Sequence, residues 1–364
     1  MAKKGMKKSV KITIIIASTV LGLILAAVGA YAGYYTLSYH RVGNMDLTVK
    51  SNCTQILYTD WTYKAVTYNI GFGAYTEDFG FFMDGGKYGR AASKESVKNT
   101  VNGAIGTLLS QKADIYMIEE VDFSATRSYR IDQQKMIEQS FSWFDTAFAQ
   151  NYDSPYLIYP FNGPLGAAKS GLMTLSDHQI DSAKRVELPV ETSFYKHFDL
   201  DRCYMVSRMP VANGKQLVVY TVHLSAYTSD GKIADEQFRL LAEDMQAEYL
   251  KGNYVLCGGD FNKDLLIDST KYFGISGEDY TWAQPLNESV LEGKNLSVVR
   301  PVNEENPIPS CRNADGPYNK NQFVITIDGF VISDNITLVD TNVIDTGFKY
   351  SDHNPVYINF ILNP

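Results

Sequence analysis

The feature that most constrains this chain is an uncharged apolar stretch near its N-terminus. Residues 12–35 carry no charged side chain and consist mainly of Ile, Val, Leu, Ala and Gly. As a helix, this stretch would extend about 36 Å, which is enough to cross a hydrocarbon core of about 30 Å. We therefore predict a transmembrane anchor at 12–35. A cleaved signal peptide is the alternative, because Ala30-Tyr31-Ala32 has the small-x-small pattern of a cleavage site.

The charges around this stretch predict the orientation of the chain. Its N-terminal side carries only basic side chains, at Lys3, Lys4, Lys7, Lys8 and Lys11. Under the positive-inside rule, residues 1–11 form a short cytoplasmic N-terminus and the rest of the chain is exported. We expect a single-pass protein of the cell membrane with an extracytoplasmic domain, or a secreted domain if the segment is cleaved.

The remainder of the chain divides into a short connection and one large domain. Residues 36–60 are polar and aromatic without clear periodicity, which is typical of a stalk. Residues 61–364 contain no linker rich in Pro, Gly or Ser, no repeat and no low-complexity tract. A single domain over 61–364 is the simplest organisation for this length.

Composition excludes several classes of protein. The chain is 45% apolar and 20% charged, which is typical of a folded globular protein and excludes a wholly disordered one. Residues 42–364 carry 27 basic and 41 acidic side chains, a net charge of −14. A long-range basic field for nucleic acid is therefore absent, although a bound cation can still screen a phosphate locally.

Hydrophobic patterns after residue 61 alternate between strands and helices. Residues 65–70, 115–118, 217–224 and 254–257 are short β-rich runs, and 323–333 and 355–362 predict further strands. Ser93 is a candidate cap for a helix after the first strand, and a second helical face runs from Phe238 to Tyr249. This alternation predicts large mixed sheets covered by helices, with functional side chains at strand ends.

Polar side chains suited to phosphate chemistry follow these strands. Carboxylate and amide oxygens are ligands for Mg²⁺, and an imidazole or a carboxylate can move the proton of an attacking water. Each residue alone has a simpler structural explanation, because Asp and Asn also favour turns. The prediction depends on the order of these residues along the chain and on their occurrence together. The set comprises Asn69, Glu119, Glu120, His223, Asp260, Asn262, Asp328, Asp352 and His353.

Two longer motifs make this set more specific. They are Gly258-Gly259-Asp260-Phe261-Asn262 and Ser351-Asp352-His353-Asn354-Pro355-Val356. Shorter motifs occur in a fixed order around them, at residues 67–70, 114–121, 170–176, 221–224 and 327–328. From about residue 65 to 360 the chain thereby resembles the endonuclease/exonuclease/phosphatase superfamily, which includes deoxyribonuclease I, apurinic endonucleases and neutral sphingomyelinases. One departure is Glu119, which stands where the family usually has Gln and which we expect to add negative charge.

The resemblance implies a fold and a metal site. The fold would be an α/β four-layer sandwich of the deoxyribonuclease I type, with two facing mixed sheets flanked by helices. It also implies a divalent ion, Mg²⁺ with Mn²⁺ as an alternative, held by Glu120 with Asn69 and Asp352 nearby.

The resemblance further implies catalytic roles. Asp260 and Asn262 would position or deprotonate the attacking water. His353, oriented by Asp328, would act as a base or proton relay, and His223 would contact the phosphate or protonate the leaving oxygen. Together these residues predict a metal-dependent hydrolase that cleaves phosphodiester bonds by in-line attack of water.

The substrate stays open between nucleic acid and the head group of a lipid. A nuclease would contact the phosphate backbone of nucleic acid, and Arg127, Tyr129 and Arg130 could make such contacts. The alternative is that these three residues form an ordinary solvated loop. The tether suggests a sphingomyelinase-like lipid phosphodiesterase as the alternative. The aromatic stretches 79–83 and 152–161 could then contact a membrane or a substrate, or they could belong to the core.

A third alternative is a catalytically silent surface module that keeps the fold for binding. A silent module would be expected to lose carboxylates or histidines, whereas this chain has the complete set. The sequence therefore favours an enzyme, and nothing in it indicates a protein partner.

Overall fold

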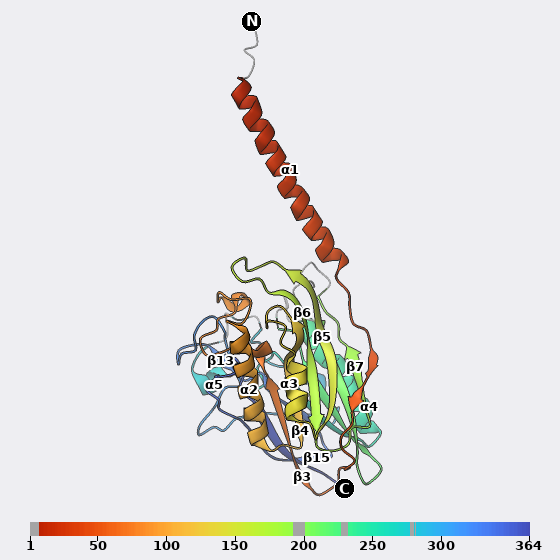
Figure 1. The fold of residues 1–364 in the computed structure, drawn as a ribbon. Coiled ribbons are helices and arrows are strands. Elements are labelled where there is room, and N and C mark those ends of the chain that lie inside the picture. Colours follow the sequence, from red (N-terminus) through yellow and green to blue (C-terminus); the bar gives the residue numbers. More distant parts are fainter. Residues whose placement is uncertain (1–6, 192–200, 227–231, 277–279, 281) are drawn as a thin grey trace.

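The N-terminal segment is one long helix that projects from the domain. The computed structural model describes residues 7–191, 201–226, 232–276, 280 and 282–364, so residues 1–6 of the predicted cytoplasmic N-terminus lie outside the described part. Helix α1 spans Lys8–Leu37 and includes the whole predicted stretch 12–35. It is long and apolar enough to cross a membrane, and its apolar part is not buried by the domain (Figure 1).

The first of two mixed sheets has seven strands. Its antiparallel order is interrupted by one parallel pair, formed by Gln216–His223 and Tyr254–Asp260. In spatial order the strands are β1 (Met45–Leu47), β7 (Ser182–Glu187), β8 (Cys203–Pro210), β9 (Gln216–His223), β10 (Tyr254–Asp260), β14 (Asp328–Ser333) and β11 (Leu296–Val299).

The second sheet also has seven strands and one parallel pair, formed by Thr62–Asn69 and Ile115–Ala125. In spatial order the strands are β15 (Ile336–Val343), β16 (Val356–Leu362), β3 (Thr62–Asn69), β4 (Ile115–Ala125), β6 (Gly166–Ser176), β5 (Asp145–Leu157) and β2 (Val49–Lys50). The short elements are a ribbon of β12 (Cys311–Arg312) and β13 (Val324–Ile325), helix α5 (Thr270–Phe273), and the 3₁₀ turns η1 (Gly71–Gly73), η2 (Phe82–Asp84) and η4 (Glu288–Leu291).

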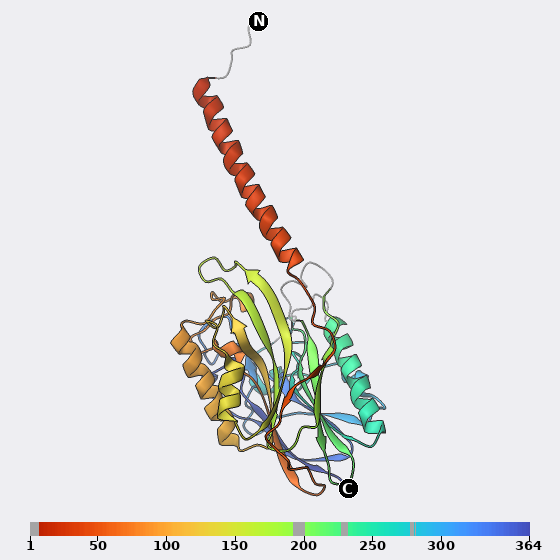
Figure 2. The same ribbon diagram turned by 45° about the vertical axis from the view of Figure 1, so that its right-hand side comes forward.

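Helices cover the outer face of each sheet. Helices α2 (Lys94–Gln111) and α3 (Gln133–Ser140) pack on the second sheet, and α4 (Lys232–Leu250) packs on the first (Figure 2). Alternate residues of β4 face opposite layers. Ile115 and Met117 pack between the sheets, whereas Tyr116 and Ile118 pack beneath α2 and α3. The predicted four-layer sandwich is confirmed.

Helix α2 determines which strand ends meet. The Ser93 side chain accepts a hydrogen bond from the Ser96 N–H at 3.0 Å and caps the first turn, as predicted. Lys112 ends the helix in the left-handed conformation. The helix returns the chain from the end of β3 to the start of β4, so the two strands run parallel and their carboxyl ends lie at one edge.

The stretch 36–60, expected to be a stalk, supplies an edge strand to each sheet. Residues 45–47 pair with β7, and residues 49–50 pair with β5. Strands of two or three residues are too short to show alternation, which explains why periodicity did not indicate them. The strand predicted over 323–333 is likewise divided into β13 and β14.

Candidate active site

All eight residues predicted for catalysis or metal binding lie at one edge of the sheets. Strands β3, β4, β9 and β10 end at or near this edge, and β14 and β16 begin there. A cleft opens at the same edge, and its walls include six of the eight residues. These are Glu120, His223, Asp260, Asn262, Asp352 and His353.

Asp260 is the centre of the site. Its Oδ2 accepts a hydrogen bond from Asn69 Nδ2 at 3.0 Å, and its Oδ1 accepts one from the Asn262 N–H at 2.9 Å. The Nε2 atoms of His223 and His353 lie 3.5 and 3.8 Å from the same Oδ2. Burial raises the pKa of Asp260 to about 7, against the opposing effect of His353. This carboxyl can therefore exchange a proton near neutral pH.

His353 is held by a buried carboxylate. Its Nδ1 lies 3.1 and 2.9 Å from the two oxygens of Asp328. Ser310 Oγ donates to Asp328 Oδ2 at 2.6 Å and accepts hydrogen bonds from two backbone N–H groups. Burial alone would lower the pKa of His353, but Asp328 and Cys311 raise it well above the usual value. The charged imidazolium form is therefore favoured.

His223 has the opposite electrostatics. Burial, followed by the positive charge of Arg202, lowers the pKa of His223 well below its usual value. Its Nδ1 has no hydrogen-bond partner among the described residues. Asp260 therefore lies between one neutral and one charged imidazole, and such a division permits separate proton-transfer and charge-stabilising roles.

A β-bulge brings Glu120 into the wall of the cleft. The register of β4 against β6 shifts between Ile118 and Val121, and Glu120 has a φ of 55°. Strict alternation would direct the side chain after Glu119 toward the helix layer. The extra residue of a bulge redirects a side chain locally, and Glu120 consequently lines the cleft.

Glu120 and Asp352 leave negative charge in the cleft that a cation could neutralise. Burial raises the pKa of both carboxyls, and the charge of Asp352 further raises that of Glu120. Glu120 Oε1 accepts a hydrogen bond from Asn69 at 3.3 Å, and the nearby Arg127 is engaged by both oxygens of Asp122. Paired carboxylates of this kind fit a hard divalent ion.

Asn69 is arranged differently from a simple metal ligand. Its Nδ2 donates to both Glu120 and Asp260, and its Oδ1 accepts from the Gly71 N–H at 3.0 Å. In this arrangement Asn69 joins the two carboxylates, with its amide nitrogen rather than its oxygen directed toward them.

A second set of possible ligand atoms lies deeper in the site. One atom from each of Asp260, Asp328 and His353 lies within 4.8 Å of the others. Both oxygens of Asp328 are already engaged by His353 or Ser310. This arrangement suits a proton relay better than a metal site.

Glu119 is buried between the sheets and does not line the cleft. Its Oε1 accepts a hydrogen bond from Thr67 Oγ1 at 3.0 Å, and its Oε2 has no hydrogen-bond partner among the described residues. Burial raises its pKa well above the usual value, so the neutral acid is favoured. The negative charge expected from its replacement of Gln is therefore largely suppressed.

The sequence did not indicate three further polar residues of the site. Arg202 and Arg312 line the cleft, and Ser310 holds Asp328 from behind. They lie outside the motifs that follow the strands, so only the folded arrangement identifies them. Arg127, expected either to contact a substrate or to lie in a solvated loop, is buried, with its guanidinium 3.8 Å from the centroid of the Phe72 ring.

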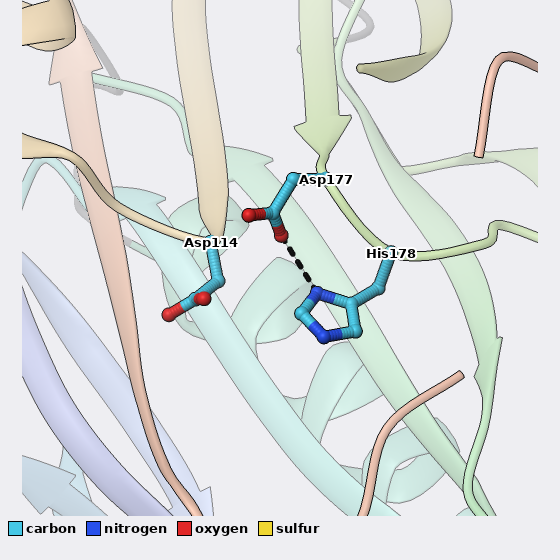
Figure 3. Close-up of side chains that lie close together, drawn as sticks. All are labelled: Asp114, Asp177 and His178. Carbon is cyan, nitrogen blue, oxygen red and sulfur yellow. Dashed lines mark hydrogen bonds and ion pairs between the residues drawn. The ribbon is translucent and has the colours of Figure 1, made fainter. Parts of the chain in front are cut away.

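A second group of two aspartates and a histidine lies at the opposite edge of the second sheet. Asp114 precedes β4, and Asp177 and His178 follow β6 (Figure 3). His178 Nδ1 lies 2.6 Å from Asp177 Oδ1, and its Nε2 lies 3.4 Å from Gln55 Nε2. Asp114 Oδ2 accepts the Lys64 N–H at 2.6 Å. These contacts join neighbouring strand ends, which is a structural role.

The domain that carries this site matches a known family over most of its length. The model of the Endonuclease/Exonuclease/phosphatase family matches residues 66–353, from β3 to the last site histidine. This chain belongs to that family. The family consists of phosphoesterase hydrolases that depend on divalent metal ions, so the chain is a hydrolase of phosphate esters. A comparison with curated proteins finds no match.

Solved structures of the family have the same fold. An endonuclease/exonuclease/phosphatase from Beutenbergia cavernae has a TM-score of 0.59 at 17% identity, over 83% of this chain and 72% of that one. ANGEL2, a 2′,3′-cyclic phosphatase in complex with adenosine-2′,3′-vanadate, has a TM-score of 0.55 at 14% identity, over 88% and 99%. D. rerio TDP2 with a single-strand DNA product has a TM-score of 0.52 at 12% identity, over 83% and 99%. At these identities the likeness establishes the fold and leaves the substrate open.

Proposed function

We propose that this protein is an exported, membrane-tethered, Mg²⁺-dependent phosphodiesterase. The observation that carries the proposal is the environment of Asp260. A carboxyl with a pKa of about 7 lies 3.5 Å from a neutral imidazole and 3.8 Å from a charged one. Groups that exchange protons near neutral pH are what the hydrolysis of a phosphodiester by water requires.

In the proposed reaction Asp260 accepts the proton of the attacking water. Asn262 holds that water in position. Its Nδ2 donates to the Leu224 carbonyl at 2.8 Å, which leaves Oδ1 as the atom that can accept a hydrogen bond from the water. Attack in line with the leaving oxygen then cleaves the ester bond.

The two histidines act on the oxygens of the phosphate. His353, kept charged by Asp328, stabilises the negative charge that develops in the transition state. His223 is neutral, so it can donate an N–H hydrogen bond to a phosphate oxygen, but it cannot protonate the leaving oxygen as the resemblance implied. The charged imidazolium of His353 is the group that can give that proton. Arg202 and Arg312 add positive charge to the cleft wall, whereas the charge of Arg127 is offset by Asp122.

Glu120 and Asp352 would hold the divalent ion. When bound, the ion supplies Lewis-acid polarisation of the phosphate group. Carboxylate donors favour Mg²⁺, with Mn²⁺ as the alternative. Asn69 would fix Glu120 relative to Asp260 through its two hydrogen bonds.

The tether is supported by α1 and by the lysines that precede its apolar part. The proposal assigns residues 1–11 to the cytoplasm, 12–35 to the membrane and 61–364 to the extracytoplasmic catalytic domain. Protease added outside intact cells should digest the domain if this topology holds. Protection of the domain until the cells are lysed would reverse the assigned orientation.

The experiment that tests the activity uses the full chain in detergent micelles. We expect hydrolysis of bis-p-nitrophenyl phosphate in Mg²⁺ to fall at least about 100-fold in EDTA and to return when Mg²⁺ is restored. Asp352→Asn should raise the Mg²⁺ concentration needed for half-maximal rate. DNA, RNA and p-nitrophenyl phosphate assayed in parallel define the substrate range. Activity unaffected by EDTA contradicts the metal requirement, and a folded chain inactive on every substrate favours a silent binding module.

A further inference from the structure

The hairpin that joins β5 to β6 is an uncharged projection beside α1. Residues 154–168 contain no charged side chain. Phe161 is 78% exposed and Tyr159 is 57% exposed, although both are large aromatic residues. An exposed apolar cluster is typical of a protein or membrane contact. We define the hairpin patch as the exposed side chains of Met83, Tyr156, Ile158, Tyr159 and Phe161.

Hydrogen bonds attach the hairpin to the last turns of α1. Tyr31 Oη donates to the Tyr156 carbonyl at 3.0 Å and accepts from the Ile158 N–H at 3.3 Å. Tyr34 Oη accepts from the Tyr156 N–H at 3.1 Å. Tyr35 is buried within the domain core. The hairpin therefore lies against the end of the helix at a defined height (Figures 1 and 2).

That height coincides with the expected surface of the bilayer. In a spanning α1, the uncharged stretch from Ile12 to Ala30 rises about 28 Å, close to the hydrocarbon thickness of about 30 Å. Tyr31, Tyr34 and Tyr35 follow directly, and Tyr is enriched at the level of the head groups. The backbone of Tyr156 and Ile158, bonded to these tyrosines, is then at the same level.

The hairpin patch also adjoins the catalytic cleft. Tyr152 and Leu165, on either side of the hairpin, line the cleft. An apolar groove between the hairpin and α1 is lined by Tyr31, Tyr35, Phe82, Met83 and residues 157–159. Met83 belongs to both linings. The groove beside α1 and the catalytic cleft are therefore neighbours, with Met83 between them.

We propose that the hairpin patch inserts into the leaflet next to α1 and holds the cleft at the bilayer surface, where it cleaves the phosphate ester of a lipid head group. The inference rests on the proposed tether and phosphodiesterase activity and names their substrate. The absence of charge in 154–168 favours lipid over nucleic acid, because a contact with nucleic acid calls for basic side chains.

Insertion is tested without any assay of activity. Full-length Phe161→Trp and Leu338→Trp are reconstituted into vesicles of palmitoyl-oleoyl phosphatidylcholine, with or without dibrominated acyl chains. Leu338 is a matched control, because it is an exposed residue of β15 away from the hairpin. The native Trp61, Trp143 and Trp282 contribute equally to both variants. We expect brominated chains to quench the added emission of Phe161→Trp at least twofold more than that of Leu338→Trp, and equal quenching overturns the insertion.

The substrate is tested with Phe161→Asp and Leu338→Asp in the full chain. Each is assayed on vesicles of phosphatidylcholine, phosphatidylglycerol and sphingomyelin and on soluble bis-p-nitrophenyl phosphate. We expect Phe161→Asp to lower lipid cleavage at least tenfold and to change soluble cleavage less than twofold, with Leu338→Asp unchanged on both.

The outcomes separate the two proposals. Undiminished lipid cleavage by Phe161→Asp overturns the role of the patch. If the unmodified chain cleaves the soluble diester but none of the lipids, the lipid substrate is wrong and the phosphodiesterase stands. If it cleaves neither, the proposed function fails, and the quenching result still decides whether the hairpin inserts.

Discussion

Two aspartates and a histidine gather at each of two opposite edges of the sheets, yet the two groups differ in what surrounds them. At the cleft, Asp260 has two imidazoles near one oxygen and lines the same wall as two further carboxylates. At the opposite end, Asp114 and His178 contact a backbone N–H, an adjacent aspartate and a glutamine. The same residue types therefore serve different purposes.

The two groups differ in how many of their carboxyl groups are buried without full neutralisation of their charge. The pKa values of Asp260, Glu120 and Asp352 are all raised, because burial of these carboxyls outweighs the positive charge of neighbouring arginines and of His353. Buried carboxyls of this kind lower the stability of the fold. They are typical of functional sites, where a substrate or a metal ion neutralises their charge. At the opposite edge burial also raises the pKa of Asp114, but the side chains there contact a backbone N–H, a glutamine and each other and do not line the cleft.

The largest expected effect comes from Asp260→Asn. The substitution keeps the size of the side chain and removes the group that accepts the proton, so we expect kcat/KM to fall about 10³-fold. Steady-state kinetics and circular dichroism melting measure this, with the melting temperature changing by no more than a few degrees. Asp177→Asn at the opposite edge is the control and should keep activity within twofold. Asp260→Asn with more than a tenth of the original activity would remove this residue from the mechanism.

The second prediction concerns the stability of the end opposite the cleft. Buried Glu248 accepts hydrogen bonds from Arg208, Lys251 and Asn253. Burial alone would raise its pKa, but these partners outweigh it and lower the pKa to about 2. We expect Glu248→Gln to lower the free energy of unfolding by about 2 kcal/mol at pH 7, with kcat/KM unchanged.

The pH dependence of this effect has a definite sign. The folded pKa of Glu248 is depressed, so its stabilisation is fully present above the usual pKa of 4.5 and is lost as the pH falls toward about 2. Urea unfolding at pH 7, 4 and 3 should therefore show the two proteins converging. A constant difference between them at all three pH values is inconsistent with this account.

A smaller effect on rate is expected from Ser310→Ala. Loss of the hydroxyl leaves Asp328 free to turn, and His353 is then less firmly oriented. We expect kcat to fall about tenfold with KM nearly unchanged, because the serine does not line the cleft. Ser310→Thr, which restores a hydroxyl, should recover part of the rate. Equal losses in both variants would indicate a packing defect instead of a positioning role.

The smallest effect is expected from Asp114→Asn. Burial, with a contribution from Asp177, raises the pKa of Asp114, so its ionised form costs stability near neutral pH. Asn keeps an oxygen for the Lys64 N–H and removes the charge. We expect the free energy of unfolding to rise by up to about 1 kcal/mol, with activity within twofold. A large loss of activity would mean that both edges take part in catalysis.

The sequence predicts the parts of this molecule that are specified locally. The strands before Asn69 and Asp260 and the helix capped by Ser93 follow from short-range patterns, and the order of the motifs indicates one catalytic edge. Other features depend on contacts between distant residues. Ser310 reaches Asp328 only because an irregular segment folds back on β14, and Glu120 reaches the cleft through a bulge. No periodic pattern in the sequence indicates the contact of Ser310 or the bulge at Glu120.

The two short strands after α1 have a consequence for the order of folding during synthesis. Residues 45–50 are made early, but their partners are made much later, with Val49 pairing with Ala147 and Met45 with Arg185. Strand β2 must therefore remain unpaired until residue 147 has emerged, and β1 until residue 185 has emerged. These two edges of the sheets are therefore closed by the first part of the domain to leave the ribosome, after their partner strands have been made.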